Sequence, residues 1–363
     1  MNTAPLLQAD CAPLLIGSLP LDDHRRAAQM VLEYTPEIPL WIQLPSYPQE
    51  QMIPQFLPGM PGLREVDGRQ FVDTSAPDFD EALVEFYEAY MQAAEDDSFL
   101  QQSRFALRPE VAAGLPALLE VLSESGQTPR AVKGQVTGPF TFCTGVKDES
   151  DAAIFYNPQL RDAAVKLLAL KARWQVRRLA SLDSPVLIFF DEPALAGFGT
   201  SEFISISRED ISECLQEVIE AVHGAGALAG IHVCANTDWS LVLESGADIV
   251  SFDAYSYFDR FILYDRQIRD FLSAGKLVAW GIVPTGDLSA IEAATTEALT
   301  AGWQEKFAAV EALGIDRRAL YSQSLITPSC GAGSLPPAAA EKVVRLTREV
   351  SDRIRAQFQA ESA

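Results

Sequence analysis

The stretch SPVLIFFDEP, residues 184–193, sets the pattern for the whole chain. Its apolar run Val186–Phe190 has no polar residue at alternate positions, which is typical of a strand buried on both faces of a parallel sheet. A helical pattern follows at Arg208–Gly224, and a second apolar run at Leu228–Ala235. The order strand, helix, strand predicts a repeating βα unit.

The same alternation extends from this stretch in both directions along the chain. Apolar runs bounded by turn residues predict eight strands, at Ala12–Pro20, Ile38–Leu44, Ala131–Pro139, Ser184–Pro193, Leu228–Ala235, Asp248–Tyr255, Lys276–Thr285 and Leu320–Gly331. The clearest helical patterns lie at Gln159–Leu182, Arg208–Gly224, Asp259–Ala274, Ile291–Leu313 and Pro337–Ala360.

Eight strand–helix units favour an α/β fold of the (β/α)₈ TIM-barrel type, with a doubly wound sheet as the alternative. The long interval Pro45–Arg130 separates the second and third predicted strands, so a helical and loop insertion is expected there. Within it, the segment Pro48–Gly62 is expected to form an ordered loop near the barrel mouth. No linker is evident, and the chain, 1–363, is expected to form a single barrel domain.

The composition argues against several classes of partner. The chain has 28 Lys and Arg against 50 Asp and Glu, a formal net charge of −22, which repels phosphate backbones and anionic lipid. Neither nucleic acid nor a membrane is therefore an expected partner. Residues Met1–Pro20 lack the pattern of a signal peptide. Five scattered cysteines do not suggest a disulfide framework, so reduced thiols in the cytoplasm are expected.

Polar and metal-binding residue types gather where the predicted strands end. Gly17 and Ser18 end the first strand, Asp191 the fourth, His232 and Cys234 the fifth, and Cys330 the eighth. In a TIM barrel the carboxyl ends of the strands meet on one face, which carries the catalytic groups. The sequence therefore predicts one site at this face.

His232, Cys234 and Cys330 are the candidate metal ligands. Residues two apart on a strand point the same way, so His232 and Cys234 can reach one ion, and Cys330 can complete the set across the mouth. Imidazole and thiolate ligands select zinc. The competing interpretation is that each cysteine is a small buried apolar residue, which is expected for Cys11 and Cys214 and is left open for Cys143.

Two thiolate ligands also indicate a type of chemistry. They make zinc a weaker Lewis acid than the ligand sets that activate water, and they suit a metal that keeps a substrate thiol deprotonated and nucleophilic. The predicted reaction is alkyl transfer to sulfur.

Several short segments, in the same order, resemble the catalytic half of cobalamin-independent methionine synthase, in the superfamily that includes uroporphyrinogen decarboxylase. These segments cover nearly the whole chain and are Ile16-Gly17-Ser18, Phe190-Asp191-Glu192-Pro193-Ala194, His232-Val233-Cys234, Asn236 with Asp238, Gly246-Ala247-Asp248, Asp253 and Ser329-Cys330-Gly331.

The resemblance implies a zinc enzyme that methylates homocysteine to methionine. By this likeness, Gly17 and Ser18 would offer backbone N–H groups to the amino-acid carboxylate, and Asp191 would pair with its ammonium group. The family's fourth zinc ligand is Glu, and Asp253 stands at the matching position.

Two further departures concern the methyl donor. The family has a histidine at the end of the seventh strand, which protonates the folate leaving group, but WGIVPT, residues 280–285, contains none. The resemblance is to the catalytic half alone, so a stand-alone core form is expected. A methyl group on cobalt leaves without a proton donor, so the expected donor is methylcobalamin or another methylcorrinoid, with a corrinoid protein as a candidate partner.

Three alternatives stay open at this point. A methylcobamide:coenzyme M type of methyltransferase would keep the zinc chemistry with another small thiol, but its acceptor has no ammonium group for Asp191. A decarboxylase of the uroporphyrinogen type would need arginine clusters at the mouth. A structural zinc site would have four closed ligands in a compact module.

Overall fold

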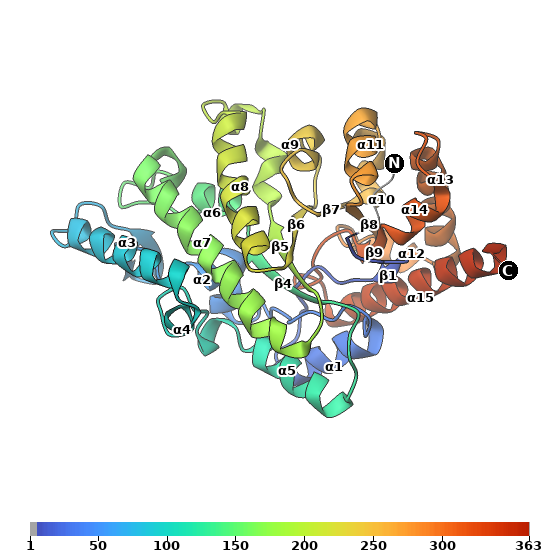
Figure 1. Cartoon of the computed structure of the whole chain (residues 1–363), viewed down its shortest axis with the longest axis horizontal. Coiled ribbons are helices and arrows are strands. Elements are labelled where there is room, and N and C mark those ends of the chain that lie inside the picture. The colour runs from blue at the N-terminus through green and yellow to red at the C-terminus, as the bar shows by residue number, and fades with distance from the viewer. Residues whose placement is uncertain (1–5, 363) are drawn as a thin grey trace.

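Seven parallel strands form the central sheet of the chain (Figure 1). The computed structural model describes residues 6–362. Residues 1–5 and 363 of the predicted domain, 1–363, lie outside the described residues. The strand order is β1-β9-β8-β7-β6-β5-β4. The bounds are β1 Ala12–Pro13, β4 Val132–Thr137, β5 Val186–Asp191, β6 Leu228–Val233, β7 Ile249–Phe252, β8 Leu277–Val283 and β9 Ser324–Pro328. The α/β class and a TIM-like sequential order are confirmed.

The alternation of side chains along each strand separates two apolar cores. On β5, Leu187 and Phe189 belong to a small cluster inside the curved sheet, while Ile188 and Phe190 pack in the larger cluster beneath the helices. Because side chains two apart share a face, Asp191 continues the inner row of Leu187 and Phe189. The inner face is thus apolar toward the amino ends of the strands and polar toward their carboxyl ends.

The predicted second strand, Ile38–Leu44, is wrong as a regular strand. This bridged segment, residues 38–44, makes two isolated parallel bridges, from Gln43 to Ser18 and from Leu40 to Lys133. It therefore lies between β1 and β4. Pro39 has no N–H to donate to a ladder, and its carbonyl accepts from the backbone N–H of Lys133 at 2.9 Å. The first strand is also shorter than predicted, with only Ala12–Pro13 regular.

Helices follow the strands on the outside of the sheet (Figure 1). Their bounds are α6 Pro139–Gly145, α7 Pro158–Leu179, α8 Arg208–Gly224, α9 Trp239–Leu243, α10 Ala254–Phe261, α11 Asp265–Ser273, α12 Leu288–Ala293, α13 Thr296–Glu311, α14 Arg317–Ser322 and α15 Pro337–Ser362.

Two of the predicted helices are each divided in the structure. The pattern at Asp259–Ala274 covers part of α10 and all of α11, and Leu263 between them is 69% exposed, which interrupts the apolar face. The pattern at Ile291–Leu313 covers part of α12 and all of α13. The side chain of Thr295 accepts from the N–H of Ala298 and starts the second of these helices.

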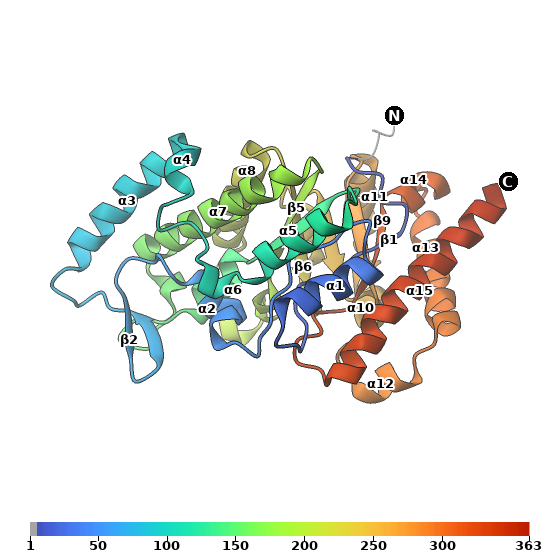
Figure 2. The same cartoon turned by 90° about the horizontal axis from the view of Figure 1, so that it is seen from below.

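The interval between the bridged segment and β4 holds the predicted helices. It also holds a β-hairpin, which was not predicted. It contains α2 Met52–Phe56, α3 Phe79–Glu95, α4 Asp97–Leu100 and α5 Gly114–Ser125, with the antiparallel strands β2 Leu63–Val66 and β3 Arg69–Val72. Figure 2 shows α3 and the hairpin projecting together on one side of the molecule. Before this interval, α1 spans His24–Tyr34.

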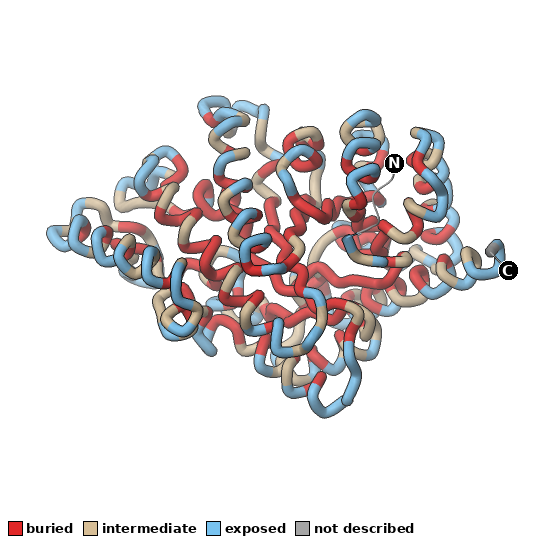
Figure 3. Tube along the Cα trace, in the orientation of Figure 1, coloured by how far each residue is buried: buried red, intermediate tan, exposed pale blue. Residues whose placement is uncertain are grey.

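The sheet and the inward faces of the helices are the most buried parts of the chain, as Figure 3 shows. Every position of β4, β5, β7, β8 and β9 is buried, and β8 is apolar throughout, as is β5 up to Asp191. Among the described residues, no helix combines the length and apolar character needed to cross a membrane.

Glu37 fixes the start of the bridged segment against α15. Its carboxylate accepts from Arg348 at 2.9 Å and from Arg355 at 2.7 Å. Burial alone would raise its pKa, but the bonds from the two arginines hold that pKa below its ordinary value of 4.5.

We expect Glu37→Gln to lower the free energy of unfolding by about 2 kcal/mol at pH 7, because two half-buried arginines lose their charge partner. A depressed folded-state pKa stabilises above the unfolded value, so the difference from the wild type should shrink as the pH falls below 4.5. Urea unfolding from pH 3 to pH 7 measures it. Glu305→Gln on the exposed face of α13 is the control, and an equal loss in both variants would contradict the prediction.

Candidate metal centre

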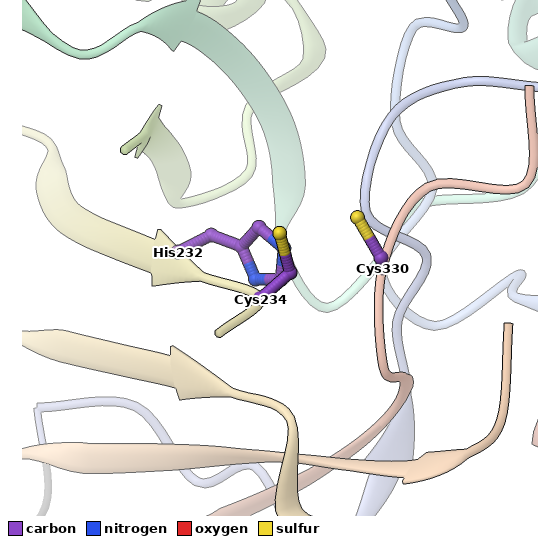
Figure 4. A group of neighbouring side chains, drawn as sticks. All are labelled: His232, Cys234 and Cys330. Atoms are coloured by element: carbon purple, nitrogen blue, oxygen red, sulfur yellow. The ribbon is translucent and has the colours of Figure 1, made fainter. Parts of the chain in front are cut away.

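His232, Cys234 and Cys330 meet at the carboxyl end of the sheet. One ligand atom from each lies within 4.8 Å of those of the other two. Figure 4 shows His232 and Cys234 at the end of one strand and Cys330 facing them from a second segment. His232 is on β6 and Cys330 follows β9, so two distant parts of the sequence contribute.

The two ring nitrogens of His232 have different surroundings. Its Nδ1 lies 3.0 Å from the hydroxyl oxygen of Ser251, the residue that pairs with it in register on β7. Its Nε2 is buried and has no hydrogen-bond partner among the described residues. If Nδ1–H donates to Ser251, the lone pair of Nε2 is left for a metal, as is usual for a histidine ligand. The buried, unpartnered nitrogen beside two thiols fits a zinc ion.

The two cysteines influence each other's ionisation. A hydrogen bond from the Cys330 thiol and the nearby His232 lower the pKa of Cys234, against the opposing effect of burial. The Cys234 thiolate in turn raises the pKa of Cys330. Without a cation the pair therefore keeps one proton, and a bound cation favours the loss of both.

Asp253 lies near this cluster but not within it. One oxygen of its carboxylate accepts from the backbone N–H of Ser256 at 2.8 Å, which caps α10. Burial raises its pKa, and the charges of Cys234 and His232 also act on it. Its predicted role as a fourth ligand stays a prediction, since its ligand atoms are not among those that lie within 4.8 Å of one another.

A cavity of about 390 Å³ opens over the three candidate ligands. The predicted substrate-binding residues Gly17, Ser18 and Asp191 line this cavity. The segment Pro48–Gly62, expected to be a loop, is partly helical and contains α2. It contributes to the wall of the cavity through Glu50, Gln51 and Met52. The structure thus brings together every predicted site residue except Asp253.

Asp191 and Glu192 are neighbours with different surroundings. Asp191 is 8% exposed, and its Oδ1 is buried without a partner among the described residues, so it is available to a bound cation. Burial raises its pKa, while Lys133 and His232 act in the opposite direction. Glu192 instead accepts from the backbone N–H groups of Phe140 and Thr141 at the start of α6. Glu192 is therefore a structural cap, and Asp191 faces the cavity.

Two polar residues of this region were not predicted from the sequence. Ser251 is the polar residue of strand β7, and Lys133 lies in the buried strand β4 together with Gln135 and Thr137. A polar residue inside a buried strand is the signal that would have found both. Because β6 and β7 are neighbours in the sheet, Ser251 on β7 lies beside the candidate ligand His232 on β6.

No protein-family model matches the chain. No curated protein matches it either. Two solved structures show weak similarity. One is described as a xylose isomerase-like TIM barrel/4-hydroxyphenylpyruvate dioxygenase fusion protein, at 14% identity and a TM-score of 0.34, covering 67% of this chain and 42% of that one. The other is a cube-shaped, highly porous designed protein cage, at 13% identity and a TM-score of 0.26, covering 64% of this chain and 75% of the other. Scores this low carry no argument about function.

Proposed function

We propose that this protein is a zinc-dependent methyltransferase that transfers a methyl group to the thiol of homocysteine. The observation that carries the proposal is the cluster of His232, Cys234 and Cys330, with the unpartnered Nε2 of His232, at the floor of a cavity. His232 and the two cysteines would hold the ion, with Asp253 as the candidate fourth ligand. When bound, zinc supplies the positive charge that keeps the acceptor sulfur deprotonated at neutral pH.

The cavity wall offers groups for both ends of an amino acid. Asp191 has a buried carboxylate oxygen without a partner, which suits the ammonium group of the acceptor. Gly17 and Ser18 would receive its carboxylate through their backbone N–H groups. A Cβ added at Gly17 would lie 2.7 Å from Oε1 of Gln43, so glycine keeps this part of the wall open.

The proposed methyl donor is a methylcorrinoid such as methylcobalamin. Residues 280–285, WGIVPT, carry no group that could protonate a folate nitrogen. In the proposed reaction the cobalt–carbon bond breaks, a sulfur–carbon bond forms, and the electron pair of the broken bond stays on cobalt. Cobalt therefore leaves without a proton.

Five exposed apolar side chains lie in segments that follow the carboxyl ends of the strands or of the bridged segment. Met52, Tyr156, Ile204, Tyr255 and Leu288 are between 41% and 85% exposed, and each follows the carboxyl end of a strand or of the bridged segment. Exposed apolar side chains on one side of a sheet can contribute to a contact surface. They support a donor that is too large for the cavity and that rests on its mouth, either as a free corrinoid or bound to a corrinoid protein.

We further infer that the sheet closes as a single (β/α)₈ barrel, with residues 45–130 as an insertion. The bridges of Gln43 to Ser18 and of Leu40 to Lys133 support closure, because they join the two edges of the seven-stranded sheet through one segment. All five cysteines lie in the described part of the chain and are unpaired, which fits a reducing compartment such as the cytoplasm.

The test is methyl transfer by the zinc-loaded protein with homocysteine as the acceptor. Methylcobalamin and methyl-tetrahydrofolate are compared as donors, and methionine is measured as the product. We expect methionine with methylcobalamin and at least ~100-fold less with the folate, because the folate nitrogen lacks an acid catalyst. Good activity with the folate alone would overturn the donor proposal. Methylation of a thiol sulfonate in preference to homocysteine would overturn the acceptor proposal.

A further inference from the structure

Lys133 is a fully buried lysine directly behind the cavity wall. It is 0% exposed and lies on β4, on the inner face of the sheet. Its Nζ donates to the backbone carbonyl of Ile16 and to Oε1 of Gln135, the latter at 3.3 Å. Ile16 lines the cavity next to Gly17 and Ser18. Only the backbone of Ile16 therefore separates the ammonium group of Lys133 from the proposed carboxylate site.

The charges around the cavity are otherwise unfavourable for an anion. Its lining includes the carboxylates of Glu50 and Asp191 as well as two thiols, and none of the described lining residues is a lysine or an arginine. A zinc ion with two thiolate ligands has no net charge. An acceptor that brings both a thiolate and a carboxylate would meet net repulsion unless a cation lies close by.

Lys133 can supply that cation. Burial lowers its pKa to about 8, and the charge of Asp191 acts in the opposite direction, so the side chain stays mostly protonated at pH 7. The ring of Phe189, with its centroid 4.8 Å from Nζ, also favours the charged form. In an interior of low dielectric constant, a charge acts strongly on a group that it does not touch.

We propose that Lys133 is a positioning residue that makes the site selective for thiols carrying a carboxylate. Its charge stabilises the carboxylate of the acceptor beside Gly17 and Ser18, and its bond to the Ile16 carbonyl fixes the backbone that receives it. Asp191, on the neighbouring strand, receives the ammonium group. The inference rests on the proposed function, because it assigns the acceptor class of the same site.

The test separates the carboxylate of the acceptor from the rest of the molecule. Homocysteine and 3-aminopropane-1-thiol have the same thiol, ammonium group and chain length, but the second has no carboxylate. Binding of each to the zinc-loaded full chain is measured by calorimetry, without a methyl donor. For Lys133→Met we expect about tenfold weaker binding of homocysteine, the loss typical of one charged interaction, and no loss in the binding of the amine.

Three further variants complete the design. Asp191→Asn should weaken both thiols, because both carry the ammonium group. Lys171→Met removes the other fully buried lysine, on α7, whose charge interacts with Arg108, and should change neither affinity. Lys133→Gln can still donate to the Ile16 carbonyl without a charge, and should behave as Lys133→Met does. It serves if the methionine variant does not fold.

The outcomes distinguish this inference from the proposed function. Equal losses for both thiols in the Lys133 variants would mean a purely structural role and would overturn the inference, as would unchanged binding of homocysteine. If the wild type transfers no methyl group to any thiol, the proposed function fails. The selective loss of carboxylate binding would still be measured, since it needs no donor.

Discussion

Replacing Cys234 or Cys330 by alanine is expected to lower the zinc affinity of the protein by more than about 100-fold and to abolish methyl transfer. A four-ligand zinc site with thiolates binds with about 10–16 kcal/mol, so one ligand contributes roughly 3 kcal/mol. The three predicted ligands lie within 4.8 Å of one another, and no other described residue belongs to their group. A lost thiolate therefore has no obvious substitute.

Zinc content after dialysis against a chelator of known affinity measures this effect without any assay of activity. Cys214→Ala, on the outer helix α8, is the control, because Cys214 is also an unpaired thiol. Circular dichroism shows whether each variant folds. Full zinc content in both Cys234→Ala and Cys330→Ala would sink the proposed metal centre and the function built on it.

Gly281→Ala is expected to lower the free energy of unfolding by about 3 kcal/mol and to weaken zinc binding at the same time. A Cβ at Gly281 would lie 2.5 Å from the carbonyl oxygen of Phe252 and 2.9 Å from the Cα of Ser329. Both are backbone atoms of neighbouring strand ends, which cannot move aside as a flexible side chain can, so the cost should reach the upper part of the range for overpacking.

The effect on zinc follows from what stands beside Gly281. Ser329 precedes the ligand Cys330, and its backbone N–H donates to the carbonyl of Val283 across the irregularity in β8. Displacing Ser329 therefore moves one thiol away from the other two ligands. Gly286→Ala is the control, because a Cβ there meets nothing within 4 Å. Urea unfolding and zinc titration measure the two effects, and a Gly281→Ala protein with wild-type stability would contradict the prediction.

The strand positions could be predicted because burial on two faces leaves a local mark. Every residue of β5 is buried and Val186–Phe190 is apolar throughout, and the same holds for Leu277–Val283 of β8. The bridged segment could not be predicted in the same way. Its residues are as apolar as those of a regular strand, but Pro39 interrupts the ladder and only two isolated bridges form.

Some properties of the site also depend on nearby residues in the sequence, and others depend on residues far away in the chain. The spacing of His232 and Cys234 is a local property, since side chains two apart on a strand share a face. The free nitrogen of His232 is not, because it depends on Ser251, which comes from the neighbouring strand. Asp191 and Glu192 show the same limit. Both are acidic residues at a strand end. Side-chain alternation places Asp191 on the inner face, but only the position of α6 makes Glu192 a cap.

By itself, the sequence determined seven of the eight predicted strands, their order, and which residue types end them. Those properties depend on neighbours along the chain, through apolar runs, turn residues and side-chain alternation. The tertiary structure decided which ends meet and what surrounds each polar group there. It brought Cys330 to His232 and Cys234 and placed Lys133 behind Ile16. It also engaged one oxygen of Asp253 in the cap of α10. The physical reason is that hydrogen bonding and electrostatics depend on distances in space, which contacts between distant parts of the chain set.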